Sequence, residues 1–227
     1  MCWVSAGCSL WESVWDCLGN RRCAACDDLL QPGASVKALC ATCFDLCEPF
    51  VGRGPLFDDA PPCYSAFHYD GPLAQALIRF KWHGRDDLAE PLGKLLRPLV
   101  AEHLRTHDYL VPVPLHPARL RQRGYNQATL LAKSALPNRG MRRKLCVTGL
   151  TVTKPNQPAR RLGRSARFER VADHFVSSAA HLLGGKRVLL VDDVITTGAT
   201  VAACAKALSA IGVSHVSAVS LLRVSPA

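Results

Sequence analysis

The sequence predicts an α/β domain, with a central and mostly parallel sheet flanked by helices, behind a small four-cysteine module. Strand-like and helical apolar patterns alternate from about residue 65 to the C-terminus. The run VLLV at 188–191 is apolar throughout, as in a strand covered by helices on both faces. Two C-x2-C pairs near the N-terminus indicate the module. We therefore expect an N-terminal helix and the module in residues 1–60, and the α/β domain in residues 61–227.

The elements of the larger domain follow from their apolar spacing. Prolines of YLVPVP end a strand at residue 114, and apolar residues spaced by three and four positions indicate helices on either side of it. The stretch LHPARLRQRGYNQ then opens a single helix that runs to about residue 136. The expected strands are 65–69, 109–114 and 188–191, and the expected helices are 73–82, 88–104, 115–136 and 201–210.

Two adjacent carboxylates, Asp192 and Asp193, follow the last strand, and open α/β sheets bind ligands at the carboxyl ends of their strands. Next comes a Thr-Thr-Gly loop, in which Gly198 permits a tight turn into the following helix. The free N–H groups at that helix start favour an anion, although the lysine of a nucleotide-binding P-loop is absent. This order indicates a sugar phosphate site, and the alternative is a purely structural strand-loop-helix with a surface acidic pair.

The whole run VLLVDDVITTGAT at 188–200 resembles the signature of type I phosphoribosyltransferases, which bind 5-phosphoribosyl-1-pyrophosphate (PRPP) with Mg2+. The resemblance implies the type I phosphoribosyltransferase fold. It also implies that Asp192 and Asp193 are the catalytic pair and bind the ribose 2- and 3-hydroxyls. The residues that it assigns to the 5-phosphate are Ile195, Thr196, Thr197, Gly198, Ala199 and Thr200.

In that fold the loop after the first core strand contacts the pyrophosphate, and residues 113–119 occupy this place here. The resemblance thus makes Pro114, Arg119, Arg121 and Arg123 candidate ligands, since guanidinium groups suit a phosphate. A solvated basic helix face is the alternative reading of the arginines. Lys81 is expected to support either the site or the contact with the cysteine module.

Two further stretches, YDGPLAQALIRFKWHGR and VPVPLHPARLRQRGYNQ, accompany the cysteine module and the PRPP loop. The combination resembles the ComF (ComFC/GntX) family of competence-associated phosphoribosyltransferase-like proteins, from Cys23 to the C-terminus. The resemblance implies a role in DNA uptake for natural transformation. Its implied partners are single-stranded DNA and competence or recombination-loading proteins.

The module contains two C-x2-C motifs, Cys23 with Cys26 and Cys40 with Cys43. Two such motifs supply four thiolates for a structural Zn2+. Disulfides or spare thiols are the alternative. The stretch 20–48 has few large apolar side chains, so its folding is expected to depend on the metal. Cys146 and Cys204 are expected to be small buried residues in a strand and a helix.

Positive charge concentrates in one segment. Residues 119–170 carry +13, against +10 for the whole chain, so the basicity is local and is expected beside the PRPP site. One PRPP engages only a few cations, so the surplus indicates a nucleic acid backbone, with solubility alone as the alternative. The candidate nucleic acid contacts are Arg142, Arg143, Lys144, Arg160, Arg161, Arg164 and Arg167.

These observations leave two kinds of function open. One is a PRPP-binding protein of natural competence that contacts single-stranded DNA, and the other is an active phosphoribosyltransferase of nucleotide or base salvage with an unknown acceptor. No apolar stretch approaches the ~20 residues of a membrane span. Eleven cysteines without an export signal are typical of a reducing compartment, so a cytoplasmic location is expected.

Overall fold

The computed structural model describes residues 22–30, 38–52, 60–136, 138–153 and 174–225. The expected N-terminal helix and four of the candidate nucleic acid contacts, Arg160, Arg161, Arg164 and Arg167, lie outside these residues.

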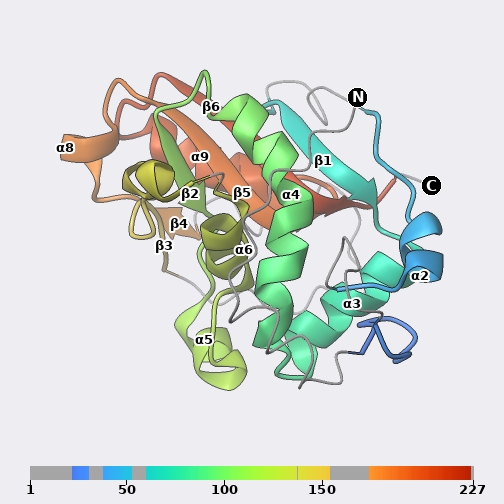
Figure 1. Cartoon of the computed structure of the whole chain (residues 1–227). Helices are drawn as coiled ribbons and strands as arrows, with labels where there is room; N and C mark the ends of the chain where they lie inside the picture. Colours follow the sequence, from blue (N-terminus) through green and yellow to red (C-terminus); the bar gives the residue numbers. More distant parts are fainter. Residues whose placement is uncertain (1–21, 31–37, 53–59, 137, 154–173, 226–227) are drawn as a thin grey trace.

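A four-stranded sheet forms the centre of the α/β domain (Figure 1). Its order is β1-β6-β5-β2, and every neighbouring pair is parallel. The inner strands β5 and β6 are almost entirely buried, because helices cover both faces. This confirms the expected α/β class with a mostly parallel sheet. The strands are β1 (Cys63–His68), β2 (Tyr109–Pro112), β5 (Arg187–Ile195) and β6 (His215–Arg223).

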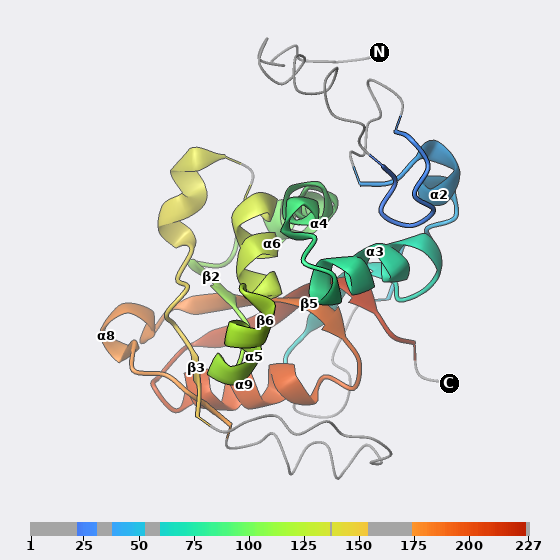
Figure 2. The same ribbon diagram turned by 90° about the horizontal axis from the view of Figure 1, so that it is seen from below.

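Helices α3, α4 and α6 lie over one face of the sheet and α9 lies over the other (Figure 2). The predicted and observed bounds of α3, α4 and α9 agree closely. The structure adds the 3-10 turn η1 (Asp86–Leu88) ahead of α4. Asp70 caps α3 by accepting a hydrogen bond from the Gly71 backbone N at 2.7 Å. The helices are α3 (Gly71–Trp82), α4 (Ala89–His103), α6 (Gln127–Ala135) and α9 (Ala199–Ser209).

The single helix expected over 115–136 is two helices, so that prediction was wrong. Gly124 adopts a left-handed φ of 86° and ends α5 (Pro117–Arg123). Asn126 then caps α6, since its Oδ1 accepts from the Ala128 backbone N at 2.9 Å while its Nδ2 donates to the Val113 carbonyl at 3.0 Å. The break separates α5 from α6 and lets α5 stand at the carboxyl end of β2.

The remaining elements frame the sheet. Two short strands pair antiparallel. Cys146 follows the turn η2 and is buried as expected, but it lies outside any strand, contrary to expectation. Cys204 is fully buried in α9, as expected. These elements are α2 (Ala41–Asp45), η2 (Arg139–Lys144), β3 (Thr151–Val152), β4 (Phe175–Val176) and α8 (Ala180–Leu183).

The cysteine module packs against the α/β domain instead of standing apart. Buried module residues such as Cys23 and Leu39 belong to the same apolar core as Leu73 and Leu77 of α3. The Phe50 backbone N donates to the Ala66 carbonyl of β1 at 3.0 Å. Folding of the module and packing of α3 are therefore coupled. In the described part of the chain, no helix combines the length and apolar character needed to cross a membrane.

Gly93 is the point of closest approach between α4 and α6. A Cβ placed there would lie 2.4 Å from the Ser134 Cβ and 3.1 Å from the Leu131 carbonyl oxygen. We expect Gly93→Ala to lower the free energy of unfolding by about 1–3 kcal/mol, through overpacking. Urea denaturation checks this, and the double variant Gly93→Ala/Ser134→Gly should recover part of the loss. A single variant as stable as the wild type would contradict the close packing.

Candidate functional site

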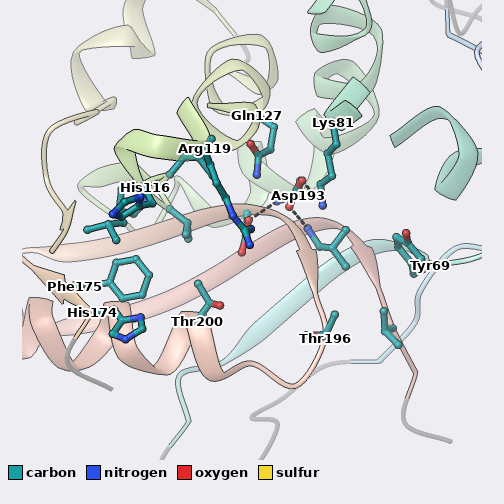
Figure 3. Close-up of a pocket in the computed structure, with 17 residues that line it drawn as sticks. Tyr69, Lys81, His116, Arg119, Gln127, His174, Phe175, Asp193, Thr196 and Thr200 are labelled. Atoms are coloured by element: carbon teal, nitrogen blue, oxygen red, sulfur yellow. Dashed lines mark hydrogen bonds and ion pairs between the residues drawn. The ribbon is translucent and has the colours of Figure 1, made fainter. Parts of the chain in front are cut away.

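The carboxyl end of β5 carries two adjacent carboxylates held by backbone hydrogen bonds. Asp192 Oδ1 accepts from the Asp193 backbone N, and Asp193 Oδ1 accepts from the Val194 backbone N, each at 2.8 Å. Asp193 is only 3% exposed. Lys81, at the end of α3, places its Nζ 2.6 Å from Asp193 Oδ2 (Figure 3). The structure thus assigns Lys81 to this site, which resolves the alternatives that the sequence left open.

Burial raises the pKa of Asp192 well above its usual range, and the adjacent charge of Asp193 raises it further, whereas Lys81 opposes both effects. Ionised Asp192 therefore costs folding free energy when no ligand is bound. Such a cost is typical of a binding site, because a ligand that donates hydrogen bonds to both carboxylates offsets it.

Asp192→Asn is expected to stabilise the ligand-free protein, by a gain of order 1 kcal/mol at neutral pH. Asparagine keeps the Oδ1 acceptor for the Asp193 amide and removes the charge. Because the pKa of Asp192 is higher in the folded than in the unfolded state, the wild type loses stability as the pH rises above the unfolded value of about 3.9. Urea denaturation at several pH values should show the gain of the variant growing with pH. A gain that shrinks with pH, or a variant less stable than the wild type at pH 7, would contradict this account.

The loop between β5 and α9 forms the turn expected from its sequence. Gly198 has a left-handed φ of 81°, and Thr197 Oγ1 accepts from the Ala199 backbone N at 3.4 Å. Thr196 and Thr200 face the cavity described below, whereas the Ile195 side chain is 2% exposed and packs in the core. The loop therefore offers two hydroxyls and the amides at the start of α9 to an anion.

A cavity of about 510 Å³ opens at this end of the sheet (Figure 3). Arg119 extends into it from α5 and Lys81 from α3, both above the strand end that carries Asp193. The cavity collects residues predicted from separate parts of the sequence. Those that line it are Pro114, Arg119, Asp192, Asp193, Thr196 and Thr200.

The other predicted PRPP residues stand back from this cavity. Arg121 is exposed on α5, and Arg123 lines a neighbouring cavity with Trp82. Burial lowers the pKa of Arg123, and the charge of Asp193 opposes that shift. The side chains of Ile195, Thr197, Gly198 and Ala199 do not line the cavity, so only their backbone groups are placed to act.

Several lining residues were not predicted as ligands from the sequence. His116 caps α5 by accepting from the Ala118 backbone N at 3.2 Å, and Gln127 accepts from Arg123 Nη1 at 2.5 Å. His174 and Phe175 reach the cavity from β4, across from His116 (Figure 3). Two of these residues had a signal in the sequence, since His116 lies in the loop 113–119 that was expected to contact the pyrophosphate and Lys81 was expected to support either the site or the cysteine module. The additional lining residues with polar or aromatic side chains are Tyr69, Lys81, His116, Gln127, His174 and Phe175.

The four predicted zinc ligands come together in space. One Sγ from each of Cys23, Cys26, Cys40 and Cys43 lies within 4.8 Å of the others, and Cys26 and Cys40 are 3.7 Å apart. Tetrahedral zinc at a Zn–S distance of about 2.3 Å requires sulfurs about 3.8 Å apart. Burial raises the pKa of Cys23, but amide hydrogen bonds from Cys26, Cys40 and Ala25 outweigh it and lower the pKa to about 7. The cluster can therefore hold a metal ion such as zinc.

The part of the basic segment that forms η2 lies away from the carboxylate pair, contrary to expectation, whereas Arg119 of the same segment lines the cavity. Lys144 Nζ donates to the carbonyls of Leu104 and His107, at 2.9 and 2.8 Å. His107 precedes β2, so η2 stands at the amino end of the sheet, opposite the cavity. Arg142 and Arg143 are exposed there, while Lys144 serves as a structural contact.

A parallel sheet that carries an acid pair, a Thr-Gly loop and a cavity at its carboxyl end defines a phosphoribosyltransferase-like protein. Residues 141–225 match the family described as phosphoribosyl transferase domain. Competence protein F of Haemophilus influenzae is 32% identical over 69% of this chain and 70% of its own length. The chain belongs to the ComF family of phosphoribosyltransferase-like proteins and is related to competence proteins.

Other relatives extend the similarity along the chain. Competence protein ComFC of Streptococcus pneumoniae is 28% identical over 95% of this chain and 87% of its own length. DNA utilization protein YhgH of Escherichia coli K12 is 28% identical over 76% of this chain and 78% of its own length. Among solved structures, the allosteric regulatory enzyme of purine biosynthesis aligns with 59% of this chain and 25% of its own, at 20% identity and a TM-score of 0.36.

Proposed function

We propose that this protein binds PRPP with Mg2+ in the 510 Å³ cavity and serves DNA handling in natural competence through contact with single-stranded DNA. The observation that carries the proposal is the convergence of Asp192 and Asp193, the Thr196–Thr200 loop and Arg119 on one cavity. Its relatives carry the names competence protein and DNA utilization protein, which supports the second part.

Each group has a chemical part in this proposal. Amides at the start of α9, with Thr196 and Thr200, hold the 5-phosphate. Asp192 and Asp193 accept hydrogen bonds from the ribose hydroxyls, and the ion pair with Lys81 holds Asp193 in place. Arg119 and the amides after Pro114 face the pyrophosphate.

Two metal ions belong to the proposal. Asp192 and Asp193 would supply the oxygen atoms that Mg2+ prefers, and the ion would contribute positive charge against the pyrophosphate. Zn2+ would be held by Cys23, Cys26, Cys40 and Cys43 as a closed structural site. Catalysis of ribosyl transfer would require an acceptor beside this cavity, and positioning and charge neutralisation would supply the rate.

A ligand that binds only the folded state raises the melting temperature, and at 100 times its Kd the stabilisation is about 2.7 kcal/mol. We expect PRPP with Mg2+ to raise the melting temperature by several degrees, and either component alone to do so much less. Ribose 5-phosphate, which lacks the pyrophosphate, is the control ligand and should give a smaller shift. Equal melting temperatures with and without PRPP at millimolar concentration would contradict the proposal.

Binding of single-stranded DNA is expected to weaken steeply with salt, since it releases counterions. Arg142→Ala/Arg143→Ala should lower the affinity for single-stranded DNA at low salt. The slope of log K against log salt concentration should become less steep by up to about 1.4, at about 0.7 for each lost phosphate contact. Fluorescence anisotropy with a labelled oligonucleotide measures both. Arg85→Ala/Lys94→Ala removes the same charge from residues already paired with Asp87 and Glu90, so it serves as the control. A control that loses as much affinity as the η2 variant would refute a contact at η2.

A further inference from the structure

A second cavity, of about 200 Å³, opens beside the first and is bounded by α3 and α5. Lys81 and Arg119 line both cavities, so the smaller one begins one side chain away from the carboxylate pair. Both side chains point toward Asp193 from the two helices (Figure 3). A molecule seated in the smaller cavity would therefore lie next to a bound sugar phosphate. The residues that line it are Lys81, Trp82, Gly84, Arg119, Gln122 and Arg123.

Trp82 gives this cavity an aromatic wall. The residue is 58% exposed, whereas a tryptophan without a surface role is usually well buried. The Arg123 guanidinium lies 4.6 Å from the centre of the indole ring, and its Nη1 donates to Gln127 Oε1 at 2.5 Å. Gln127 in turn lines the larger cavity. Arg123 therefore contacts both the indole of Trp82 and Gln127, and so connects the two cavities.

The lining of this cavity is positively charged, and the cavity is small and open at one edge. Three of its six residues are cationic, and none of the six is acidic. Gly84 has a φ of 64° and no atom within 4 Å of a Cβ placed on it, so that edge of the cavity stays open. The volume is below the roughly 300–1,000 Å³ that takes a drug-sized ligand, so it suits one ring system.

We propose that the cavity at Trp82 binds the base of a nucleotide, whose ring stacks on the indole and whose phosphate contacts Arg119 and Arg123. Base stacking on an aromatic side chain combined with nearby cations is the general way in which proteins hold single-stranded nucleotides. The inference rests on the proposed function and deepens it, since it names the molecule that lies beside PRPP. The same chemistry serves a free nucleotide and a nucleotide at the end of a single strand.

Fluorescence quenching tests this on the full-length, zinc-containing protein, with dAMP and a 12-residue oligodeoxyadenylate as probes. The signal of Trp82 is the difference between wild type and Trp82→Phe. In a calorimetric titration, which does not depend on the indole signal, we expect Trp82→Ala to bind nucleotide about 10-fold or more weakly, and Trp82→Phe, which keeps a ring, to lose a smaller factor. Ile78→Ala, which changes another exposed apolar residue of α3, should bind as the wild type does.

PRPP titration of the same variants separates this inference from the function on which it rests. PRPP affinity that is unchanged in Trp82→Ala while nucleotide affinity falls supports a distinct base subsite. Quenching by dAMP identifies a free nucleotide as sufficient, and quenching by the oligonucleotide alone identifies the strand. Nucleotide affinity that is equal in wild type and Trp82→Ala, or no quenching by either probe at millimolar nucleotide, overturns the inference even where PRPP binds.

Discussion

Cys43→Ser is expected to cost the protein its zinc and to unfold the module of residues 22–30 and 38–52. Three thiolates cannot close a tetrahedral site, and structural zinc contributes about 10–16 kcal/mol in small zinc modules. The module has little apolar core of its own, and its buried Cys23 and Leu39 pack on α3, so the loss should extend into the α/β domain. We expect less than half a zinc per chain by metal analysis, together with a melting temperature lowered by ~10 °C or more.

Cys47→Ser is the matched control for this prediction. Cys47 lies four residues from Cys43 and donates its thiol to the Cys43 carbonyl at 3.1 Å, but it lies outside the four-sulfur cluster. Its variant should keep one zinc per chain. Full zinc content and a wild-type melting temperature in Cys43→Ser would show that this residue is not a ligand, and equal loss in Cys47→Ser would show that the cluster is assigned wrongly.

Asp192→Asn/Asp193→Asn is expected to remove PRPP binding. Hydrogen bonds to charged groups contribute about 1.5–3 kcal/mol each, so the loss of two carboxylates should weaken binding by at least about 100-fold. Lys81 would also lose its charged partner and leave a half-buried ammonium at this site. Calorimetric titration with PRPP and Mg2+ measures the change, and melting temperatures confirm that the variant is folded.

Glu90→Gln/Glu102→Gln makes the same change of net charge on the exposed surface of α4 and serves as the control. It should bind PRPP as the wild type does. Affinity within threefold of the wild type in the aspartate variant would mean that the pair does not contact the ribose.

The strand-turn-helix around the acid pair could be predicted because its signals are local. An apolar run, two acids and a glycine in a left-handed turn all lie within residues 188–198. The strand β5, the turn at Gly198 and the helix α9 form as expected. The break between α5 and α6 was missed because the helical apolar pattern continues across it. Gly124 and the Asn126 cap, which together decide the break, are weak signals within a favourable pattern.

The composition of the cavity was predicted only in part, because it depends on which chain segments meet. Asp193 could be placed because it follows a strand, and Arg119 could be placed through the resemblance to type I phosphoribosyltransferases. His174 and Phe175 reach the cavity at the start of β4, which carries no signal for that role. The η2 part of the basic segment was placed wrongly, because its sequence proximity to Arg119 was taken as proximity in space, while residues 154–170 lie outside the described residues. The chain crosses from the carboxyl end of the sheet to its amino end between Arg123 and Lys144.

The most direct test of the central claim is a calorimetric titration of the zinc-containing wild-type protein with PRPP, with Mg2+ and with EDTA. We expect one PRPP per chain, affinity that depends on Mg2+, and competition by pyrophosphate, since the proposed site holds the ligand at both its 5-phosphate and its pyrophosphate. Absence of measurable heat at millimolar PRPP with Mg2+, from a protein shown to be folded and to contain zinc, would contradict this expectation.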